Sequence, residues 1–429
     1  MRLGLIADDL TGANDTGVQF ALRGARTFVP LDWHDLKSLT RTADVLVLNT
    51  NSRAVPARVA AERARVAAEA LRRAGVEAVY KKIDSTFRGN IGPELDAILD
   101  VFPSPLAVLT PAFPPAGRAV RDGVLLVRGV PVHRTATGRD PVTPVQESHL
   151  PTLLGRQTRR PVYALGLAVL RGTATRLDRT LGDWRAAAPG IVLADAVTPR
   201  DLDRLARLIV RDGLFGVAAG SAGLALALSE VLPWPRRARR TPPGAKAPVL
   251  LVVGSPNPTS LEQVAWIEER GQASVVRAAL GEVVADEKRY RKEMARVVKK
   301  ARAEMFADRH TVLTLTQQPS ASGRRPLRPS ASKTLSEFLG QAARLVAREV
   351  RPGGLLLCGG DIAIAACSAL GANGVELQGE VEPGVPWGRL VGGDCADLPA
   401  VTKAGGFGDP ETFARALQFL RPRSSARSR

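Results

Sequence analysis

The residues best suited to chemistry stand in one short segment, 81–90, which reads KKIDSTFRGN. It combines three cations with one carboxylate, two hydroxyls and an amide. The segment follows the mostly apolar stretch 75–80, which is typical of the end of a β-strand, and polar groups at a buried strand end are costly unless they bind something. Its cations suit an anionic ligand, and Asp84 is the best candidate in the chain for a general base. A purely structural ion-pair network is the alternative interpretation.

Two further polar clusters follow predicted strands in the first half of the chain. Asp8, Asp9 and Asp15 come after an apolar run and could hold a substrate hydroxyl or a hydrated cation, whereas a helix cap would explain only one of them. Arg53 follows another apolar run and could bind a carboxylate bidentately, although an arginine that binds loop carbonyls is the commoner case. Because ligands bind beyond the carboxyl ends of parallel strands, the fold would bring these clusters together.

Alternating apolar runs and helical stretches predict an α/β fold with two domains. Each domain is expected to be a mostly parallel sheet flanked by helices, with the active site in the cleft between them. The expected parts are an N-terminal domain over 1–233, a basic Pro/Arg linker over 234–248, a C-terminal domain over 249–420 and a basic tail over 421–429. The predicted strands of the N-terminal domain are 3–7, 45–49, 76–80 and 106–110, and its predicted helices are 13–23, 56–74 and 92–101.

The formal net charge of +18 raises the question of nucleic-acid binding. Three segments, 234–248, 320–333 and 420–429, together hold 13 Lys and Arg residues and no acid. Their composition is typical of linkers, loops and frayed ends. The chain has no recognisable helix-turn-helix, zinc finger or RNA-binding motif, and aromatic residues make up only 4%. We therefore expect no nucleic-acid partner, although the remaining positive charge favours small anions.

The chain also has the composition of a cytoplasmic protein. No apolar run reaches the roughly 18–20 residues that a transmembrane helix needs, so we expect no membrane partner. The N-terminal apolar run is too short for a secretion signal and leads directly into acids. The three widely spaced cysteines form no metal-ligand pattern and fit a reduced compartment.

Glycine-rich loops after predicted strands recur in the second half of the chain, at 254–256, 359–361 and 403–408. Glycines let a backbone approach a phosphate closely, and the free N–H groups of a helix start bind anions. None of the loops matches a P-loop or the GxGxxG motif, and a single glycine pair would be weak support. Three such loops in one domain favour a nucleotide phosphate site. The similar segment 219–223 is explained equally well by a helix packed closely on the sheet.

Together these motifs resemble those of the four-carbon acid sugar kinase family. The matching segments run along nearly the whole chain: 7–15, 81–90, 117–118, 140–141, 254–255, 359–361, 383–386 and 403–408. The resemblance implies an N-terminal domain that binds a sugar acid and a C-terminal domain that binds ATP. It further implies phosphorylation of the terminal hydroxyl of D-threonate, D-erythronate or a 3-oxo-tetronate.

The resemblance and the candidates above together assign the site residues. The substrate residues are Asp9, Arg53, Lys81, Lys82, Ile83, Asp84 and Arg88. The ATP residues are Ser255, Gly359, Gly360, Asp361, Ile362, Lys403, Gly405 and Gly406. Ile362 and Ala404 depart from the family pattern, in which Thr and Ser commonly stand there, so each removes a hydroxyl that could bind phosphate.

The predicted reaction is phosphoryl transfer from ATP, which depends mostly on positioning and charge neutralisation. Arg53 and a lysine would hold the substrate carboxylate, Asp84 would accept the hydroxyl proton, and Asp9 is the reserve candidate. Mg²⁺ would bridge the phosphates with few protein ligands, and no side chain is assigned to it. A non-catalytic sensor of sugar acids or nucleotides is the alternative, followed by a nucleic-acid-binding protein. A homodimer would be unsurprising.

Overall fold

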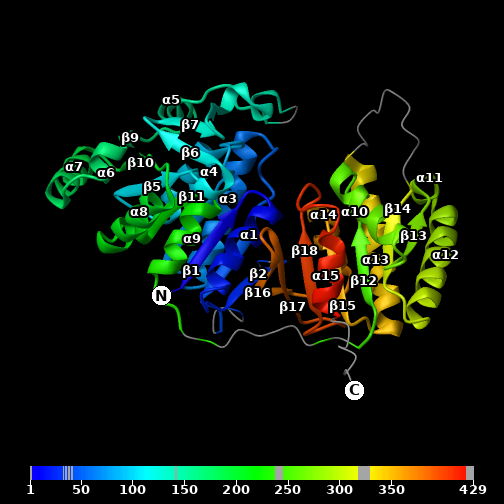
Figure 1. Ribbon diagram of the computed structural model, residues 1–429. Coiled ribbons are helices and arrows are strands. Elements are labelled where there is room, and N and C mark those ends of the chain that lie inside the picture. The colour runs from blue at the N-terminus through cyan, green and yellow to red at the C-terminus, as the bar shows by residue number, and fades with distance from the viewer. Residues whose placement is uncertain are drawn as a thin grey trace, which may run out of the picture. The chain divides into compact units, whose positions relative to one another are not determined.

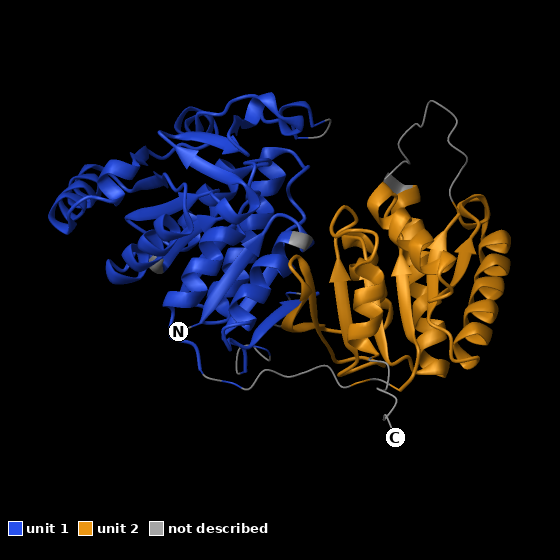
Figure 2. Ribbon diagram, in the orientation of Figure 1, with its two compact units in different colours: residues 1–238 blue, residues 239–429 orange. Residues whose placement is uncertain are grey.

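The computed structural model describes residues 2–31, 33, 36, 39, 42–140, 143–235, 237, 244, 246–316 and 329–421. The chain forms two compact units, Met1–Ala238 and Arg239–Arg429 (Figures 1 and 2). The basic segments expected at 234–248 and 320–333 lie largely outside the described residues, as does the expected tail apart from Arg421. Each unit is an α/β body with a mostly parallel sheet, so the predicted fold class is confirmed.

The first unit is built on a parallel sheet with the strand order β2-β3-β1-β4-β11-β5-β10-β9. Most of its strands are buried along their whole length, as expected for parallel strands covered by helices on both faces. The strands are β1 (Leu3–Ala7), β2 (Thr27–Pro30), β3 (Val45–Asn49), β4 (Ala78–Lys82), β5 (Leu106–Thr110), β9 (Val162–Leu165), β10 (Gly190–Ala194) and β11 (Val217–Gly220).

Helices pair up on this sheet: α3 packs against α4, and α1 packs against α9. Helix α3 illustrates the amphipathic pattern that holds such helices on the sheet. It buries a stripe of alanines that includes Ala60, Ala64 and Ala67, and it exposes Arg and Glu residues to solvent. The helices are α1 (Leu10–Ala21), α3 (Ala57–Arg73), α4 (Ile91–Val101), α5 (Leu150–Gly155), α6 (Leu167–Leu170), α7 (Ala174–Ala187), α8 (Pro199–Arg211) and α9 (Ala222–Val231).

A small antiparallel sheet is inserted between β5 and β9, and the sequence patterns did not predict it. It consists of β6 (Arg118–Arg121), β7 (Val124–Val127) and β8 (Val130–Pro131), followed by the short helices η2 (Val132–Arg134) and η3 (Ala136–Arg139). The buried carboxylate of Asp195 fastens the insertion to the main sheet, because it accepts the backbone N–H groups of Asp122 and Gly123 at 2.7 and 3.0 Å.

The second unit has the strand order β13-β14-β12-β15-β18-β17-β16, in which β16 and β17 are antiparallel to their neighbours and the other pairs are parallel. The strands are β12 (Val249–Val253), β13 (Ser274–Ala278), β14 (Thr311–Leu315), β15 (Gly354–Cys358), β16 (Gly374–Glu382), β17 (Val385–Val391) and β18 (Pro399–Lys403). The helices are α10 (Pro258–Glu269), α11 (Leu280–Val283), α12 (Glu287–Phe306), α13 (Pro329–Val350), α14 (Gly360–Ala369) and α15 (Thr412–Leu420). In the described part of the chain, no helix combines the length and the apolarity needed to span a membrane.

Strand β4 differs from its prediction in a way that matters for the site. The apolar pattern placed its end at Tyr80, but the strand continues through Lys81 and Lys82. It continues because β1 and β11 flank it on both sides, and Lys82 is in register with Ala7 and with Gly220. The two lysines are therefore strand residues, whose side chains leave the sheet on opposite faces.

Candidate functional site

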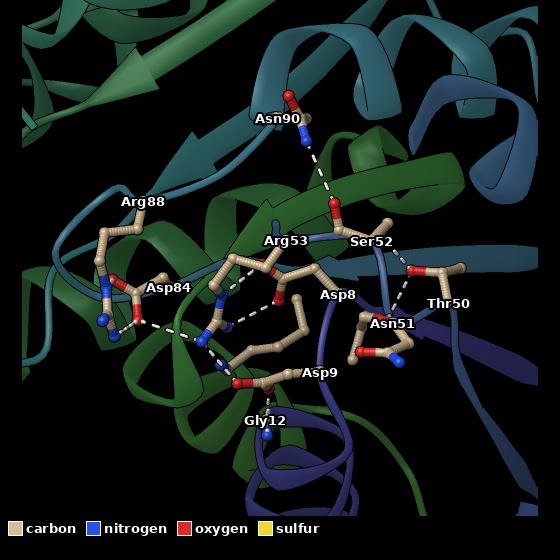
Figure 3. Close-up of polar contacts among 12 residues, drawn as sticks. Asp8, Asp9, Gly12, Thr50, Asn51, Ser52, Arg53, Asp84, Arg88 and Asn90 are labelled. Carbon is tan, nitrogen blue, oxygen red and sulfur yellow. Dashed lines mark hydrogen bonds and ion pairs between the residues drawn. The ribbon is translucent and has the colours of Figure 1, made fainter. Parts of the chain in front are cut away.

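The first polar cluster lies where β3, β1 and β4, three neighbouring strands, end at the same edge of the sheet. The segments that follow these strands carry the polar residues that the sequence singled out, and Figure 3 shows them converging on Arg53. The structure therefore brings together the three clusters that were expected to meet.

Arg53 is occupied by carboxylates. Its Nε and Nη2 donate to the two oxygens of Asp8 at 2.7 and 2.8 Å, and its Nη1 lies 2.5 Å from Asp9 Oδ2 (Figure 3). A third carboxylate, that of Asp84, lies 3.9 Å from the same Nη1. Asp8 is buried, and burial would raise the pKa of its carboxyl, but the charges of Lys81 and Arg53 outweigh that effect and the pKa is lowered. Arg53 thus neutralises protein acids, whereas the sequence analysis expected it to bind a substrate carboxylate.

Asp84 is surrounded by donors. Arg88 Nε and Nη2 donate to its two oxygens at 3.1 and 2.9 Å, and Thr86 donates from its backbone N–H at 3.0 Å and from its hydroxyl. Burial would raise the pKa of Asp84, but the hydrogen bonds from Arg88 and the charge of Arg53 outweigh it and hold that pKa well below its ordinary value. Arg88 in turn reaches Asp140, just after η3, at 3.3 Å. The inserted segment is therefore tied to the loop that carries Asp84.

Lys81 belongs to a buried network behind the strand ends. Its Nζ lies 2.6 Å from Glu94 Oε2, and both side chains are only 1% exposed. Ser52 Oγ donates to the other oxygen of Glu94 at 2.5 Å and lies 2.6 Å from the Thr50 hydroxyl. Burial raises the pKa of Glu94 in spite of Lys81. Lys81 is therefore paired with Glu94 in the protein interior, as the structural alternative describes, and its role in substrate binding stays a prediction.

Lys82 projects from the opposite face and differs from the other cations of the cluster. Within the described part of the chain, its Nζ has no hydrogen-bond or ion-pair partner. It lies across the first turn of α1, where a Cβ on Gly12 would be only 2.8 Å from Nζ. Asp9 caps this helix by accepting the Gly12 N–H at 2.6 Å, so the capping role considered for one of the three acids falls to Asp9. Ile83, the remaining predicted residue, packs its side chain in the core.

The second polar cluster lies in the other unit, where β12, β15 and β18 are neighbours in the sheet. Their carboxyl ends lead into the loops that hold Ser255, Gly359 and Gly405. A Cβ on Gly405 would lie 2.0 Å from Ser255 Oγ, so the two loops touch and a larger residue at that position would force a shift. Gly359 has a φ of 109°, a conformation open to glycine alone. Three of the predicted nucleotide residues, Ser255, Gly359 and Gly405, therefore lie close to one another.

Lys403 shapes this region from within. Its Nζ donates to the backbone carbonyls of Ala404, Gly405 and Phe407 at 2.7, 3.2 and 2.9 Å. Burial lowers the pKa of Lys403. Ser260 Oγ also donates to the Gly405 carbonyl, at 2.6 Å. With its carbonyls held inwards, the loop keeps the Gly405 and Gly406 N–H groups available, since neither has a partner among the described residues.

The start of α14 offers further donors. Its first intrahelical hydrogen bond runs from the Ala363 N–H to the Gly359 carbonyl, and no side chain caps the helix. The N–H groups of Gly360, Asp361 and Ile362 therefore stand before the first hydrogen bond of the helix and have no acceptor within it. Ile362 is buried, and a Cβ on Gly254 would lie 2.3 Å from its Cδ1. The apolar residue that replaces the family's hydroxyl is thus accommodated by a neighbouring glycine.

Several residues of the site were not assigned from the sequence. Glu94, Ser52 and Thr50 form the buried network, Asp8 binds Arg53, and Asp140 binds Arg88. Two of them carried a signal: Asp8 stands beside Asp9 at a strand end, and Asp140 belongs to the segment 140–141 that resembles the family. Among the described residues there is no group of three or more His, Cys, Asp or Glu side chains placed to hold a metal ion. The segment 219–223 serves packing, since Ser221 caps its own helix and a Cβ on Gly223 would meet the Ala112 carbonyl at 2.5 Å.

Two family domains match this chain. A sugar-binding N-terminal domain matches residues 3–228, and a nucleotide-binding C-terminal domain matches residues 250–413. The chain is 40% identical to a D-threonate kinase of Salmonella typhimurium, over 98% of both chains. It is 34% identical to a D-erythronate kinase of Heliobacterium modesticaldum, over 97% of this chain and 96% of the relative. It is 33% identical to a 3-oxo-tetronate kinase of Methylobacterium radiotolerans, over 98% of this chain and 99% of the relative.

Solved structures share the fold over nearly the whole chain. A crystal structure from Salmonella typhimurium LT2 matches with a TM-score of 0.80 and 23% identity, over 97% of this chain and 98% of that one. A second, from Haemophilus influenzae, matches with a TM-score of 0.75 and 24% identity, over 96% and 98% of the two chains. At these identities the likeness concerns the fold alone.

Proposed function

Because the chain belongs to the four-carbon acid sugar kinase family, we propose that it transfers the γ-phosphoryl group of ATP to the terminal hydroxyl of a four-carbon sugar acid. The relatives act on D-threonate, D-erythronate and 3-oxo-tetronate, as their names state. D-Threonate is our first choice of acceptor, because a D-threonate kinase is the relative that shares 40% identity with this chain.

One observation of the first unit carries the proposal. The polar strand ends hold four cations, and three of them are neutralised by carboxylates of the protein: Arg53 by Asp8 and Asp9, Lys81 by Glu94, and Arg88 by Asp84 and Asp140. Lys82 alone lacks such a partner among the described residues. A buried ammonium that no carboxylate contacts directly is better stabilised when an anionic ligand makes that contact. We propose that Lys82 binds the carboxylate of the sugar acid, with Asp9 placed to accept from a substrate hydroxyl.

Arg53 has a different role in this proposal from the one that the sequence suggested. Its bidentate contact with Asp8 and its contact with Asp9 fix the two acids at the end of β1, and its charge helps to lower the pKa of Asp8. Arg88 does the same for Asp84. Arg53 and Arg88 thereby preorganise the acceptor site, which is the main way in which enzymes of this reaction class accelerate it.

The second unit supplies the nucleotide site in our proposal. The N–H groups of Gly405 and Gly406 and those at the start of α14 would bind phosphate oxygens, helped by the positive end of the helix dipole. Ser255 would add a hydroxyl beside them, and Lys403 would act through the loop that it holds. The departures at Ile362 and Ala404 remove hydroxyls and leave the backbone donors in place, so nucleotide binding is compatible with both.

Mg²⁺ would enter with the nucleotide. Exposed Asp361 lies in the first turn of α14, among the proposed phosphate donors, and it fits an ion that keeps most of its waters and binds through one or two carboxylates and phosphates. When bound, the ion would neutralise the charge that develops on the phosphoryl group.

The proposal is tested by measuring ADP release with a panel of acceptors: D-threonate, D-erythronate, a 3-oxo-tetronate and the neutral tetritols threitol and erythritol. We expect release that depends on a sugar acid and is much weaker with either tetritol. A chain that binds ATP and a sugar acid but releases no ADP with any of them would instead be the non-catalytic sensor that was the alternative.

A further inference from the structure

The acids at the acceptor site, like its cations, divide into those with a partner in the protein and one without a partner among the described residues. Asp8 accepts two hydrogen bonds from Arg53, Asp9 accepts from Gly12 and contacts Arg53, and Glu94 contacts Lys81 and Ser52. Asp84 accepts four hydrogen bonds from Arg88 and Thr86. Asp15 alone among them has no hydrogen bond or ion pair on its carboxylate, as far as the described residues extend.

Asp15 lies beside the unpaired cation. It stands on α1 three residues after Gly12, so the two share one face of the helix. Helical side chains lean towards the N-terminus, which directs the Asp15 carboxylate towards the turn that Lys82 crosses. Lys82 and Asp9 are also the charged groups that act on the Asp15 carboxyl. The Lys82 ammonium and the Asp15 carboxylate, neither of which has a direct partner among the described residues, therefore face the same small region at the start of α1.

The properties of Asp15 are those that a proton acceptor needs. It is partly exposed, so a substrate can reach it, yet burial raises the pKa of its carboxyl above the ordinary value. The pKa of Asp84 is shifted in the opposite direction, and that carboxylate already accepts three hydrogen bonds on Oδ1 and one on Oδ2. A general base works best when its pKa approaches the working pH and when it can contact the hydroxyl directly.

We propose that Asp15, rather than Asp84, is the general base of the phosphoryl transfer, with Lys82 beside it as the cation that orients the acceptor. The inference rests on the proposed kinase function. The acceptor O–H bond breaks and its proton moves to Asp15, while the acceptor oxygen forms a bond to the γ-phosphorus. The bond between that phosphorus and the bridging oxygen of ADP breaks, and ADP leaves with the electron pair.

The test uses three substitutions in the full chain. Asp15→Asn should lower kcat by about 10²–10⁴-fold, the usual contribution of a general base, and should leave calorimetric binding of the sugar acid within about threefold of wild type. Asp15→Glu keeps a carboxylate and should recover at least tenfold of that loss. Asp183 is an exposed residue on α7, so Asp183→Asn makes the same chemical change away from the site and should leave kcat and acid binding as in wild type.

The outcomes separate the inference from the proposed function. A wild-type chain without acid-dependent ADP release would overturn both. An active wild type whose Asp15→Asn variant keeps kcat within about threefold would overturn the role of Asp15 alone. A Glu variant no better than the Asn variant would also contradict it, because proton acceptance requires a carboxylate. Should Asp84→Asn instead lower kcat by the amount expected for Asp15, with acid binding unchanged, the base would be Asp84.

Discussion

The two units differ in the polar groups that lie at the carboxyl ends of their strands. In the first unit, the strand ends carry charged side chains that mostly neutralise one another, while the Lys82 ammonium and the Asp15 carboxylate have no direct partner among the described residues. In the second unit, the loops offer backbone N–H groups, and the one lysine turns inwards to three carbonyls. In the proposed function, side chains would therefore bind the small sugar acid, whereas backbone N–H groups would bind the phosphates of the nucleotide. Charged residues at a strand end therefore do not identify a ligand site by themselves. The candidates for ligand binding are those that form no ion pair within the protein.

The largest effect that tests this contrast is expected at Lys81. Lys81→Met leaves the Glu94 carboxylate buried without a counter-charge, which should lower the free energy of unfolding by about 3–5 kcal/mol. Urea unfolding followed by circular dichroism measures it. The double variant Lys81→Met with Glu94→Met removes both charges and should regain most of the loss. A single variant as stable as wild type would mean that Lys81 is not a structural partner.

A smaller effect is expected in the nucleotide loops. In Gly405→Ala the new methyl group collides with Ser255 Oγ, so the loop must shift and the apparent constant for ATP should rise roughly tenfold to a hundredfold, about 1.4–2.8 kcal/mol. The acid constant should stay the same. Adding Ser255→Gly removes the colliding hydroxyl and should restore part of the affinity. Equal ATP constants for Gly405→Ala and wild type would show that this loop does not bind the nucleotide.

The smallest effect concerns pH and lies at neither site. Burial lowers the pKa of His310 from 6.5 to about 4, and its Nδ1 accepts the Val249 N–H at 2.9 Å. Between pH 6.5 and pH 4 the unfolded chain therefore binds a proton that the folded chain does not, so stability falls as the pH falls through this window. His310→Asn keeps an acceptor and cannot titrate. Across the window, wild type should lose roughly 1–2 kcal/mol more than the variant, an amount reduced for solvent screening, and parallel pH profiles would contradict the assignment.

The sequence predicted the architecture and the meeting of three polar clusters at the strand ends. It did not predict which partner each of their side chains contacts. Strand patterns and the order of elements identify parallel sheets, whose carboxyl ends must share an edge. The resemblance to four-carbon acid sugar kinases is confirmed over nearly the whole chain. The two lysines of KKIDST could not be told apart, because the apolar pattern ended the strand at Tyr80 and hid the alternation that sends their side chains to opposite faces.

The remaining misses are contacts between distant parts of the chain. Glu94 lies on a helix whose pattern marks it only as one more polar position, and its pairing with Lys81 depends on how α4 packs on the sheet. Asp140 reaches Arg88 from an insertion whose strands are too short to stand out in the sequence. The assignments of Asp84 and Arg53 stay predictions, and the geometry gives both residues several partners within the protein.

The central claim is that Lys82, the one cation of the four at the first unit's polar strand ends without a partner among the described residues, recognises the acid. It is tested most directly by the ratio of kcat/KM for the preferred sugar acid to kcat/KM for the corresponding neutral tetritol, in wild type and in Lys82→Met. The account predicts a ratio in wild type that falls by about 10²-fold or more in the variant, since a buried charge-assisted contact is worth roughly 3 kcal/mol. Thermal unfolding should not move to lower temperature, because Lys82 has no partner among the described residues to lose. An unchanged ratio in Lys82→Met would contradict the claim.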